Sequence, residues 1–311
     1  MRTRPLFGER VVSELGLGTW GLAGDGYGPV SESVQDEVIE RARSYGITLF
    51  ETADVYGRGA MERRLGRILG SDSSLTVVTK VGTDLDSVPA RKRFDREHLR
   101  SACERCADRL GRARLDVVLL HNPAASTLAT SDASGALAEL VEEGKIAAWG
   151  VSAGSSDVAK AALERGAQVL ELAYNVFSAA DLETLELAVG RVGVLARSVL
   201  AHGLLCGQWS DIKTFTGSDH RAERWTSEQL RGRQKQLSAL SGILGGEVQT
   251  LRAAALRFVL QNPVVSCAVV GPRNRVQLDQ LVREAGKGPD YLAAGLVQRV
   301  KDQLGRMGAA R

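Results

Sequence analysis

Short apolar runs recur along the chain and alternate with amphipathic stretches. The runs begin at residues 48, 75, 117, 147, 169, 193 and 266, and ELGLGT from residue 14 is a further candidate. They are almost continuously apolar, which is typical of strands buried on both faces of a parallel sheet. Amphipathic stretches with helical spacing lie between them, at 34–44, 96–111, 135–143, 157–165, 180–191 and 247–261. The pattern predicts eight strands, each followed by a helix.

An α/β fold with that number of repeats favours a closed (β/α)8 TIM barrel, and a doubly wound open sheet is the alternative. The length of 311 residues alone would suggest two domains, but barrels of this kind reach about 250 residues or more as one domain. No linker rich in Pro, Gly and Ser divides the chain, so we expect a single barrel domain over residues 1–311.

One connection is much longer than the others, between the runs at 193 and 266. It follows the seventh predicted strand and contains a polar stretch at 206–233. Long loops in compact domains are usually functional or disordered. Because barrel enzymes bind their ligands at the carboxyl ends of the strands, we expect this loop to cover a bound ligand.

The composition is that of a folded protein, with 44% hydrophobic and 25% charged residues and a formal net charge of +3. This small surplus does not indicate a nucleic-acid or membrane-surface partner. No stretch has the pattern of a signal peptide or a membrane span, so we expect a cytoplasmic protein. Cys103 and Cys106 fall on one helical stripe with Leu99 and Leu110, which indicates a buried helix face, and we expect no metal site.

Two other motifs are better explained without chemistry. Gly16, Gly18 and Gly21 satisfy G-x-G-x-x-G, but no helix follows immediately and no acidic residue ends a second strand at the required distance. We interpret them as a glycine-rich strand end at the mouth of a barrel. The basic stretch RKRFDREHLR at 91–100 also contains acidic residues, and we interpret it as a solvated face.

Polar residues stand at the ends of three successive predicted strands. Glu51, Asp54 and Tyr56 follow the second strand, Lys80 lies in the third and His121 ends the fourth. Since the carboxyl ends of barrel strands converge on one cavity, these side chains form a candidate catalytic set.

The segments around them are VVSELGLGTWGL, ITLFETADVYGRGAMERRLG, VVTKVG, LDVVLLHNP, GKIAAWGVSA, AYNVF, SVLAHGLL and VVGPRNRVQLDQL. With these segments the chain resembles the aldo-keto reductases over essentially its whole length. The resemblance implies a (β/α)8 barrel that binds NADP(H) in an extended form without a Rossmann fold.

The resemblance also implies a catalytic tetrad of Glu51, Tyr56, Lys80 and His121. A free phenol has a pKa near 10, so we expect Lys80 to lower the pKa of Tyr56 and make it a usable acid. His121 would hold the substrate carbonyl beside Tyr56. Trp20 would form part of the substrate wall.

The chain departs from the family pattern in several places. Glu51 stands where Asp is usual, Ala153 replaces the Asn after Ser152, Glu171 replaces a Gln that contacts the nicotinamide carboxamide, and Arg197 replaces a stacking aromatic ring. An ionised Glu171 would favour NADP⁺ over NADPH, whereas a protonated Glu171 would imitate Gln.

The cofactor-binding residues implied by the resemblance lie on the strand ends and on the last βα segment, where Arg273 and Asn274 belong to GPRNRVQLDQL. Arg273 would bind the 2′-phosphate, which favours NADP over NAD. The full set is Thr19, Trp20, Ser152, Glu171, Arg197, Ser198, Leu200, Gly203, Gly271, Arg273, Gln277 and Gln280.

The sequence therefore predicts an NADP(H)-dependent oxidoreductase that interconverts a small-molecule carbonyl compound and an alcohol by hydride transfer. The alternative is a cofactor-binding regulatory or scaffold protein with little turnover, which the changes at Glu51 and Glu171 keep open. No residue selects a particular substrate, a reaction direction or an oligomeric state.

Overall fold

Eight parallel strands close into a barrel in the computed structural model, in the order β10-β11-β12-β3-β4-β5-β8-β9. The structure describes residues 1–130, 132–178, 186–207, 209, 214–215, 217, 219–242 and 244–306. The barrel fold is thus confirmed, and every predicted strand is present. Their bounds are β3 Leu15–Gly18, β4 Leu49–Glu51, β5 Thr76–Val81, β8 Leu115–His121, β9 Ile146–Ser152, β10 Val169–Ala173, β11 Gly193–Arg197 and β12 Cys267–Val270.

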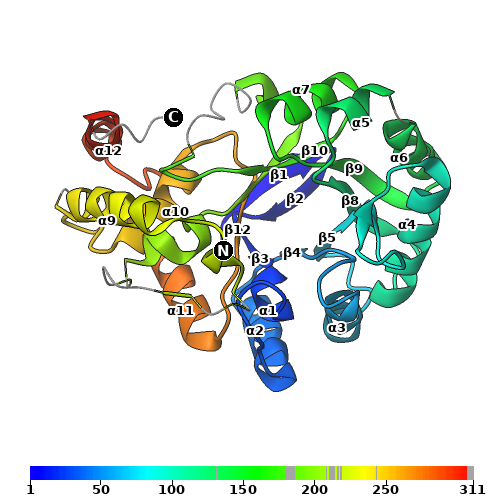
Figure 1. Ribbon diagram of the computed structural model, residues 1–311, viewed down its shortest axis with the longest axis horizontal. Helices are drawn as coiled ribbons and strands as arrows, with labels where there is room; N and C mark the ends of the chain where they lie inside the picture. The colour runs from blue at the N-terminus through cyan, green and yellow to red at the C-terminus, as the bar shows by residue number, and fades with distance from the viewer. Residues whose placement is uncertain are drawn as a thin grey trace.

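Helices form an outer ring around these strands (Figure 1). The ring contains α2 Glu32–Ser44, α3 Ala60–Leu69, α4 Arg96–Leu110, α6 Ala133–Glu142, α7 Ser156–Glu164, α10 Leu251–Gln261 and α11 Arg275–Glu284. Shorter or peripheral helices are α1 Trp20–Ala23, α5 Ala125–Thr130, α9 Ser227–Ser241, α12 Ala294–Arg306, and the 3-10 helices η2 Ala201–Cys206 and η3 His220–Ala222. The helix expected at 180–191 falls partly on residues 179–185, which lie outside the described residues.

An antiparallel hairpin closes the amino end of the barrel, and the sequence pattern did not reveal it. Its strands are β1 Thr3–Phe7 and β2 Arg10–Ser13. Leu6 and Val12 pack into the barrel interior with Leu49, Val169 and other strand side chains. A second small hairpin pairs β6 Thr83–Asp84 with β7 Arg91–Lys92 near the opposite end. Side chains of the first hairpin therefore fill the amino end of the barrel interior.

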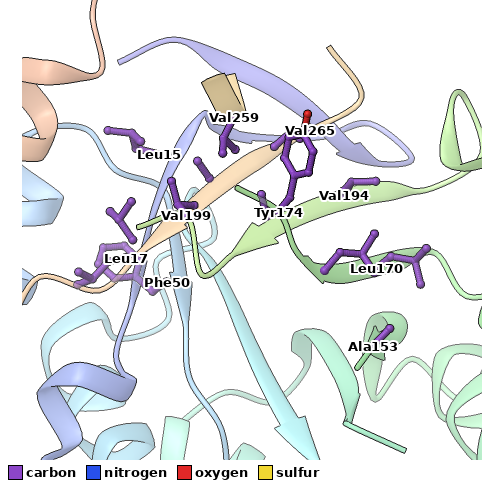
Figure 2. Close-up of a cluster of buried hydrophobic side chains, with 14 of the residues drawn as sticks. Leu15, Leu17, Phe50, Ala153, Leu170, Tyr174, Val194, Val199, Val259 and Val265 are labelled. Carbon is purple, nitrogen blue, oxygen red and sulfur yellow. The ribbon is translucent and has the colours of Figure 1, made fainter. Parts of the chain in front are cut away.

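The larger core lies between the barrel and the helices. Figure 2 shows part of it, with Leu15 and Leu17 of β3, Leu170 of β10 and Val194 of β11 in a cluster that also includes Val259 of α10. Side chains on a strand alternate between faces, so the intervening Gly16 and Gly18 face the interior. A Cβ on Gly16 would lie 2.7 Å from Leu49 Cδ2 and 2.8 Å from Cys267 Sγ. Packing inside the barrel therefore explains these two glycines.

The cysteine stripe is also explained by packing. Cys103 and Cys106 are buried on α4 with Leu99 and Leu110. In the described part of the chain, no three His, Cys, Asp or Glu side chains gather as a metal site would require. No helix in that part is both long and apolar enough to cross a lipid bilayer.

The long excursion after β11 contains more regular structure than expected. Helix α9 begins at Ser227, within the stretch predicted to be loop. Thr226 and Gln229 form a capping box, in which each side chain accepts a hydrogen bond from the other residue's backbone N–H. This T-x-x-Q spacing was a readable signal, but the helix buries few apolar residues and contains Gly232, so its periodicity is weak.

Candidate active site

A cavity of about 700 Å³ opens at the carboxyl ends of the barrel strands. The structure brings to it every predicted catalytic and cofactor-binding residue except one. Thr19 is fully buried, and its backbone N–H and its Oγ1 donate to the Glu51 carbonyl at 2.9 and 3.0 Å. Thr19 therefore supports β4 and is not among the residues that line the cavity, and its contact with a cofactor stays a prediction.

Lys80 is the centre of the predicted catalytic set. Its side chain is 2% exposed, and its ammonium forms an ion pair with Glu51. The same Nζ donates to the Tyr56 hydroxyl at 3.2 Å and to the Thr52 carbonyl at 3.2 Å. The Tyr56 hydroxyl lies 3.4 Å from Glu51 Oε1. Adjacent strands β4 and β5 supply Glu51 and Lys80, while the turn after β4 brings Tyr56 back over them.

The expected lowering of the Tyr56 pKa by Lys80 is not found. Burial raises the pKa of Tyr56, and the negative charge of Glu171 raises it further, against a smaller opposing effect of Arg197. Burial also lowers the pKa of Lys80 to about 8, which Glu171 opposes. Two carboxylates, those of Glu51 and Glu171, pair with the one ammonium and partly offset its charge, while the hydrogen bond from its Nζ to the Tyr56 hydroxyl remains.

His121 is a neutral imidazole at the end of β8. Burial lowers its pKa well below the usual range, and the charge of Lys80 adds to this effect. Its ring meets that of Tyr56 edge to face, with centroids 6.2 Å apart. Its Nδ1 has no hydrogen-bond partner among the described residues. Lys92, from the basic stretch interpreted as a solvated face, donates to the His121 carbonyl at 2.7 Å, so that interpretation holds only in part.

Glu171 lies on β10 and is 1% exposed. Its Oε2 accepts a hydrogen bond from Ser152 Oγ at 2.5 Å and lies 3.9 Å from Arg197 Nε, while its Oε1 lies 3.6 Å from Lys80 Nζ. Arg197 also donates to the Ala153 carbonyl at 3.0 Å. The residues that replace the family's usual carboxamide contacts thus form one charged network beside the tetrad.

The roof of the cavity joins two segments that are distant in sequence. Tyr27 and Asp219 form a β-bridge, and the His220 N–H donates to the Gly26 carbonyl at 2.9 Å. Arg221 pairs with Asp219 and lies over the Tyr27 ring at 4.7 Å. The part of the long connection that is described therefore covers the cavity, as expected of it.

Aromatic side chains gather under this roof, and sequence reasoning identified only Trp20 among them. The Trp20 ring lies 5.1 Å from Tyr27 and 4.6 Å from His220. Tyr27 Oη and His202 Nδ1 are 3.4 Å apart, and burial raises the pKa of Tyr27 to about 12 and lowers that of His202 to about 3. Both groups are therefore neutral near pH 7. The sequence carried a weak signal, since Trp209 and Trp225 lie in the long polar connection.

Several cavity residues hold backbone conformations that favour glycine. Asn122, Ser198 and His202 have φ values of 50°, 56° and 58°, and all three line the cavity. Left-handed non-glycine residues cost of order 1 to 3 kcal/mol each and cluster at functional sites. Asn122 follows His121 and Ser198 follows Arg197, which supports a binding role for this end of the barrel.

The far end of the cavity is built by β12 and the start of α11. Gly271, Gln277 and Gln280 line it. Arg273 Nε donates to the Gly21 carbonyl at 3.1 Å and its Nη2 to the Gly28 carbonyl at 2.7 Å. Asn274 caps α11 by accepting from the Gln277 N–H. The guanidinium is thus fixed at the end of the cavity by the loop after β3.

Comparison with known proteins identifies the class to which this barrel belongs. The sequence model of the Aldo/keto reductase family matches residues 14–286. The chain belongs to the aldo/keto reductase family. It is 27% identical to aldo-keto reductase YhdN of Bacillus subtilis (strain 168), over 88% of this chain and 85% of that protein.

Solved structures agree on the fold. The glycerol dehydrogenase AKR11B4 from Gluconobacter oxydans aligns with a TM-score of 0.84 and 25% identity, over 98% of this chain and 95% of that one. The holo form of aldo-keto reductase AKR11C1 from Bacillus halodurans aligns with a TM-score of 0.82 and 22% identity, over 97% and 96%. Membership of the family implies oxidoreduction of carbonyl compounds with a nicotinamide cofactor.

The residues present fit such a cofactor. The residues that line the cavity extend from Lys80 on β5, through β11 and β12, to Gln280 on α11. Arg197 Nε is buried and has no hydrogen-bond partner in the described residues, which leaves a donor for a ligand. Gly203, which lines the cavity under the roof, has a φ of 90°, a backbone conformation that other residues rarely adopt.

Proposed function

We propose that this chain is an NADP(H)-dependent oxidoreductase that interconverts an aldehyde or ketone and an alcohol, with Tyr56 as general acid and base. The observation that carries the proposal is the 3.2 Å contact between the Tyr56 hydroxyl and the Lys80 ammonium on the wall of a cavity of about 700 Å³. A phenol and a buried ammonium in contact, with a carboxylate holding the ammonium, form a proton donor for a carbonyl oxygen.

A bound nicotinamide supplies the hydride in reduction and accepts it in oxidation. In reduction, Tyr56 gives its proton to the carbonyl oxygen, and Lys80 stabilises the phenolate that remains. His121 is neutral and donates one hydrogen bond, which holds the carbonyl oxygen near Tyr56. In oxidation the same phenolate removes the proton of the alcohol. Glu51 keeps Lys80 in place throughout.

We propose that the cofactor extends from the tetrad toward α11. Ser152, Glu171 and Arg197 would hold the nicotinamide end. Ser198, Leu200 and Gly203 would hold the pyrophosphate under the roof. At the adenine end the candidates are Gly271, Arg273, Gln277 and Gln280.

Arg273 supports NADP over NAD. Two of its nitrogens bind backbone carbonyls, which leaves Nη1 with no hydrogen-bond partner among the described residues. The first turn of α11 follows it directly, and the free N–H groups of a helix N-terminus favour a phosphate. A 2′-phosphate placed between the guanidinium and this helix end would bind both Nη1 of Arg273 and the backbone N–H groups of the first helical turn.

The experiment that tests the proposal follows the absorbance of the reduced nicotinamide with a panel of aldehydes, ketones and sugars, and in the opposite direction with alcohols. Polyols belong in the panel because one structural relative is a glycerol dehydrogenase. We expect turnover with at least one of these classes. Stoichiometric NADPH binding with no turnover in either direction would favour the cofactor-binding regulatory or scaffold protein instead.

A further inference from the structure

Two carboxylates from opposite sides of the barrel meet at one ammonium. Glu51 lies on β4 and Glu171 on β10, which are separated by three strands in either direction around the closed sheet. Lys80 on β5 forms ion pairs with both, and Glu171 Oε1 lies 3.6 Å from its Nζ. All three side chains are no more than 6% exposed. Water therefore screens these charges little.

We infer that Glu171 is a positioning residue of the catalytic tetrad, which clamps Lys80 together with Glu51 and thereby keeps the Tyr56 hydroxyl protonated. This inference rests on the proposed function, in which Tyr56 exchanges the proton. It assigns Glu171 an effect on the acid and base chemistry in addition to any contact with the nicotinamide.

The orientation of the carboxylate supports this role. Ser152 Oγ donates to Glu171 Oε2 at 2.5 Å, which fixes one oxygen and turns the other toward Lys80. Arg197 Nε lies 3.9 Å from the same oxygen. The carboxyl group is thus held from one side, with its other oxygen toward the Lys80 ammonium.

The charges around Tyr56 show how this arrangement affects the ionisation of its hydroxyl. The charged or titratable groups that face Tyr56, Lys80 and His121 come from several elements: Tyr27, Glu51, Asp54, Lys92, Glu171 and Arg197. Of these, Glu171 raises the pKa of Tyr56 more than any other charge, and Arg197 only partly offsets it. A neutral Gln in place of Glu171 would leave Lys80 with a single carboxylate and more charge for a phenolate.

The reaction should therefore respond to pH differently in its two directions. Reduction needs the protonated phenol, which the negative charge of Glu171 preserves as the pH rises, including above about 8, where Lys80 loses its own charge. Oxidation needs the phenolate, which the same negative charge disfavours, so oxidation should require alkaline conditions. Removing one charge within about 7 Å at an effective dielectric near 20 shifts an ionisation by between about one and two pH units.

The direct test is a spectrophotometric titration of tyrosinate in the protein without cofactor, which needs no activity. Subtracting the curve of Tyr56→Phe from that of the parent isolates the ionisation of Tyr56, and the same subtraction is made in the Glu171→Gln background. We expect the Tyr56 midpoint to fall by about one pH unit or more in Glu171→Gln. Ser152→Ala, which keeps the charge, should move the midpoint by much less.

A Glu171→Gln curve that coincides with the parent would overturn the inference, and so would an equal shift in Ser152→Ala. Circular dichroism and melting curves over the same pH range show whether each variant is folded where it is titrated. If the parent and Glu171→Gln both reduce a substrate, the alkaline limb of the kcat/KM profile should lie at lower pH in Glu171→Gln. The displacement should equal the shift of the Tyr56 midpoint. Absence of turnover would defeat the proposed function while leaving the titration result readable.

Discussion

Gly18 and Glu51 face each other inside the barrel on the paired strands β3 and β4. A Cβ on Gly18 would lie 2.9 Å from Glu51 Oε2 and 2.9 Å from Val269 Cγ1. The family pattern has Asp at position 51, and the additional methylene of Glu needs space on the neighbouring strand. Gly18 provides that space, which explains how the longer carboxylate reaches Lys80 within the usual barrel geometry.

Gly18→Ala should therefore displace the Glu51 carboxylate and lower kcat by about ten- to a hundredfold, because misplacement by about 1 Å can cost a factor of about a hundred. Overpacking should also cost about 1 to 3 kcal/mol of unfolding free energy. Combining it with Glu51→Asp should restore much of the lost kcat, although the contact with Val269 remains. Gly232→Ala is the control, since a Cβ there meets nothing within 4 Å. If the double variant is no more active than Gly18→Ala, the glycine does not serve Glu51.

Tyr56→Phe should reduce kcat by about a hundredfold or more, the usual contribution of general acid catalysis. NADPH affinity should stay close to that of the parent, since the phenol acts on the carbonyl oxygen. Steady-state kinetics and fluorescence titration of NADPH measure the two effects separately. Tyr45→Phe is a control at the carboxyl end of α2, away from the cavity, where the hydroxyl donates to Asp279 and accepts from Arg41. A Phe variant that keeps more than about a tenth of the parent kcat would exclude Tyr56 as the acid.

The barrel strands could be predicted from the sequence because each is a continuous apolar run, and a candidate catalytic set could be predicted because polar residues lie in or just after three successive strands. Contacts between distant parts of the chain could not be predicted in this way. The approach of Glu171 to Lys80 crosses the barrel, and the bridge between Tyr27 and Asp219 joins segments about two hundred residues apart. The β1–β2 hairpin escaped notice because its strands, TRPLF and RVVS, mix charged and apolar residues and form no continuous apolar run.

Arg273→Ala should weaken NADPH binding by about ten- to a hundredfold and NADH binding much less, because a charge-assisted contact is worth roughly 1.5 to 3 kcal/mol. Dissociation constants for both cofactors measure the difference. Arg275→Ala is the matched control, because that neighbour pairs with Glu37 on the exposed surface at 3.4 Å. Since Arg273 also fixes the loop after β3, a melting curve should accompany each variant. Equal losses for NADPH and NADH would remove the 2′-phosphate assignment.

Glu171→Gln should also shift the ratio of the NADP⁺ and NADPH dissociation constants toward NADPH. Only the oxidised ring is positively charged, and an anion a few ångströms away favours it by up to about 3 kcal/mol at an effective dielectric near 20. The pairing of Glu171 with Lys80 and Arg197 reduces the shift below that limit. Isothermal titration calorimetry of NADP⁺ and NADPH at pH 7 measures this ratio in the parent and in the variant. An unchanged ratio would mean that the carboxylate does not reach the nicotinamide.

Asp54 makes the stability of the fold depend on pH. It lies between Glu51 and Tyr56 in the sequence, is 3% exposed, and its Oδ1 has no hydrogen-bond partner among the described residues. Burial raises its pKa to about 7 from 3.8, and the nearby charge of Glu62 adds to the rise. Between these two values the unfolded chain is ionised at this position while the folded protein retains the proton.

Folding is therefore favoured by this group at low pH, and the advantage is lost as the pH rises through about 7. Its contribution to the unfolding free energy should fall by up to about 1.4 kcal/mol per pH unit over this window. Asp54→Asn cannot ionise, so urea denaturation from pH 4 to pH 8 should show a growing stability advantage of the variant over the parent as pH rises. Asp86→Asn, at an exposed position, should show no such trend. A stability difference between parent and Asp54→Asn that is constant with pH would mean that the buried carboxyl titrates at its ordinary value, stabilised by Lys92 or Arg109.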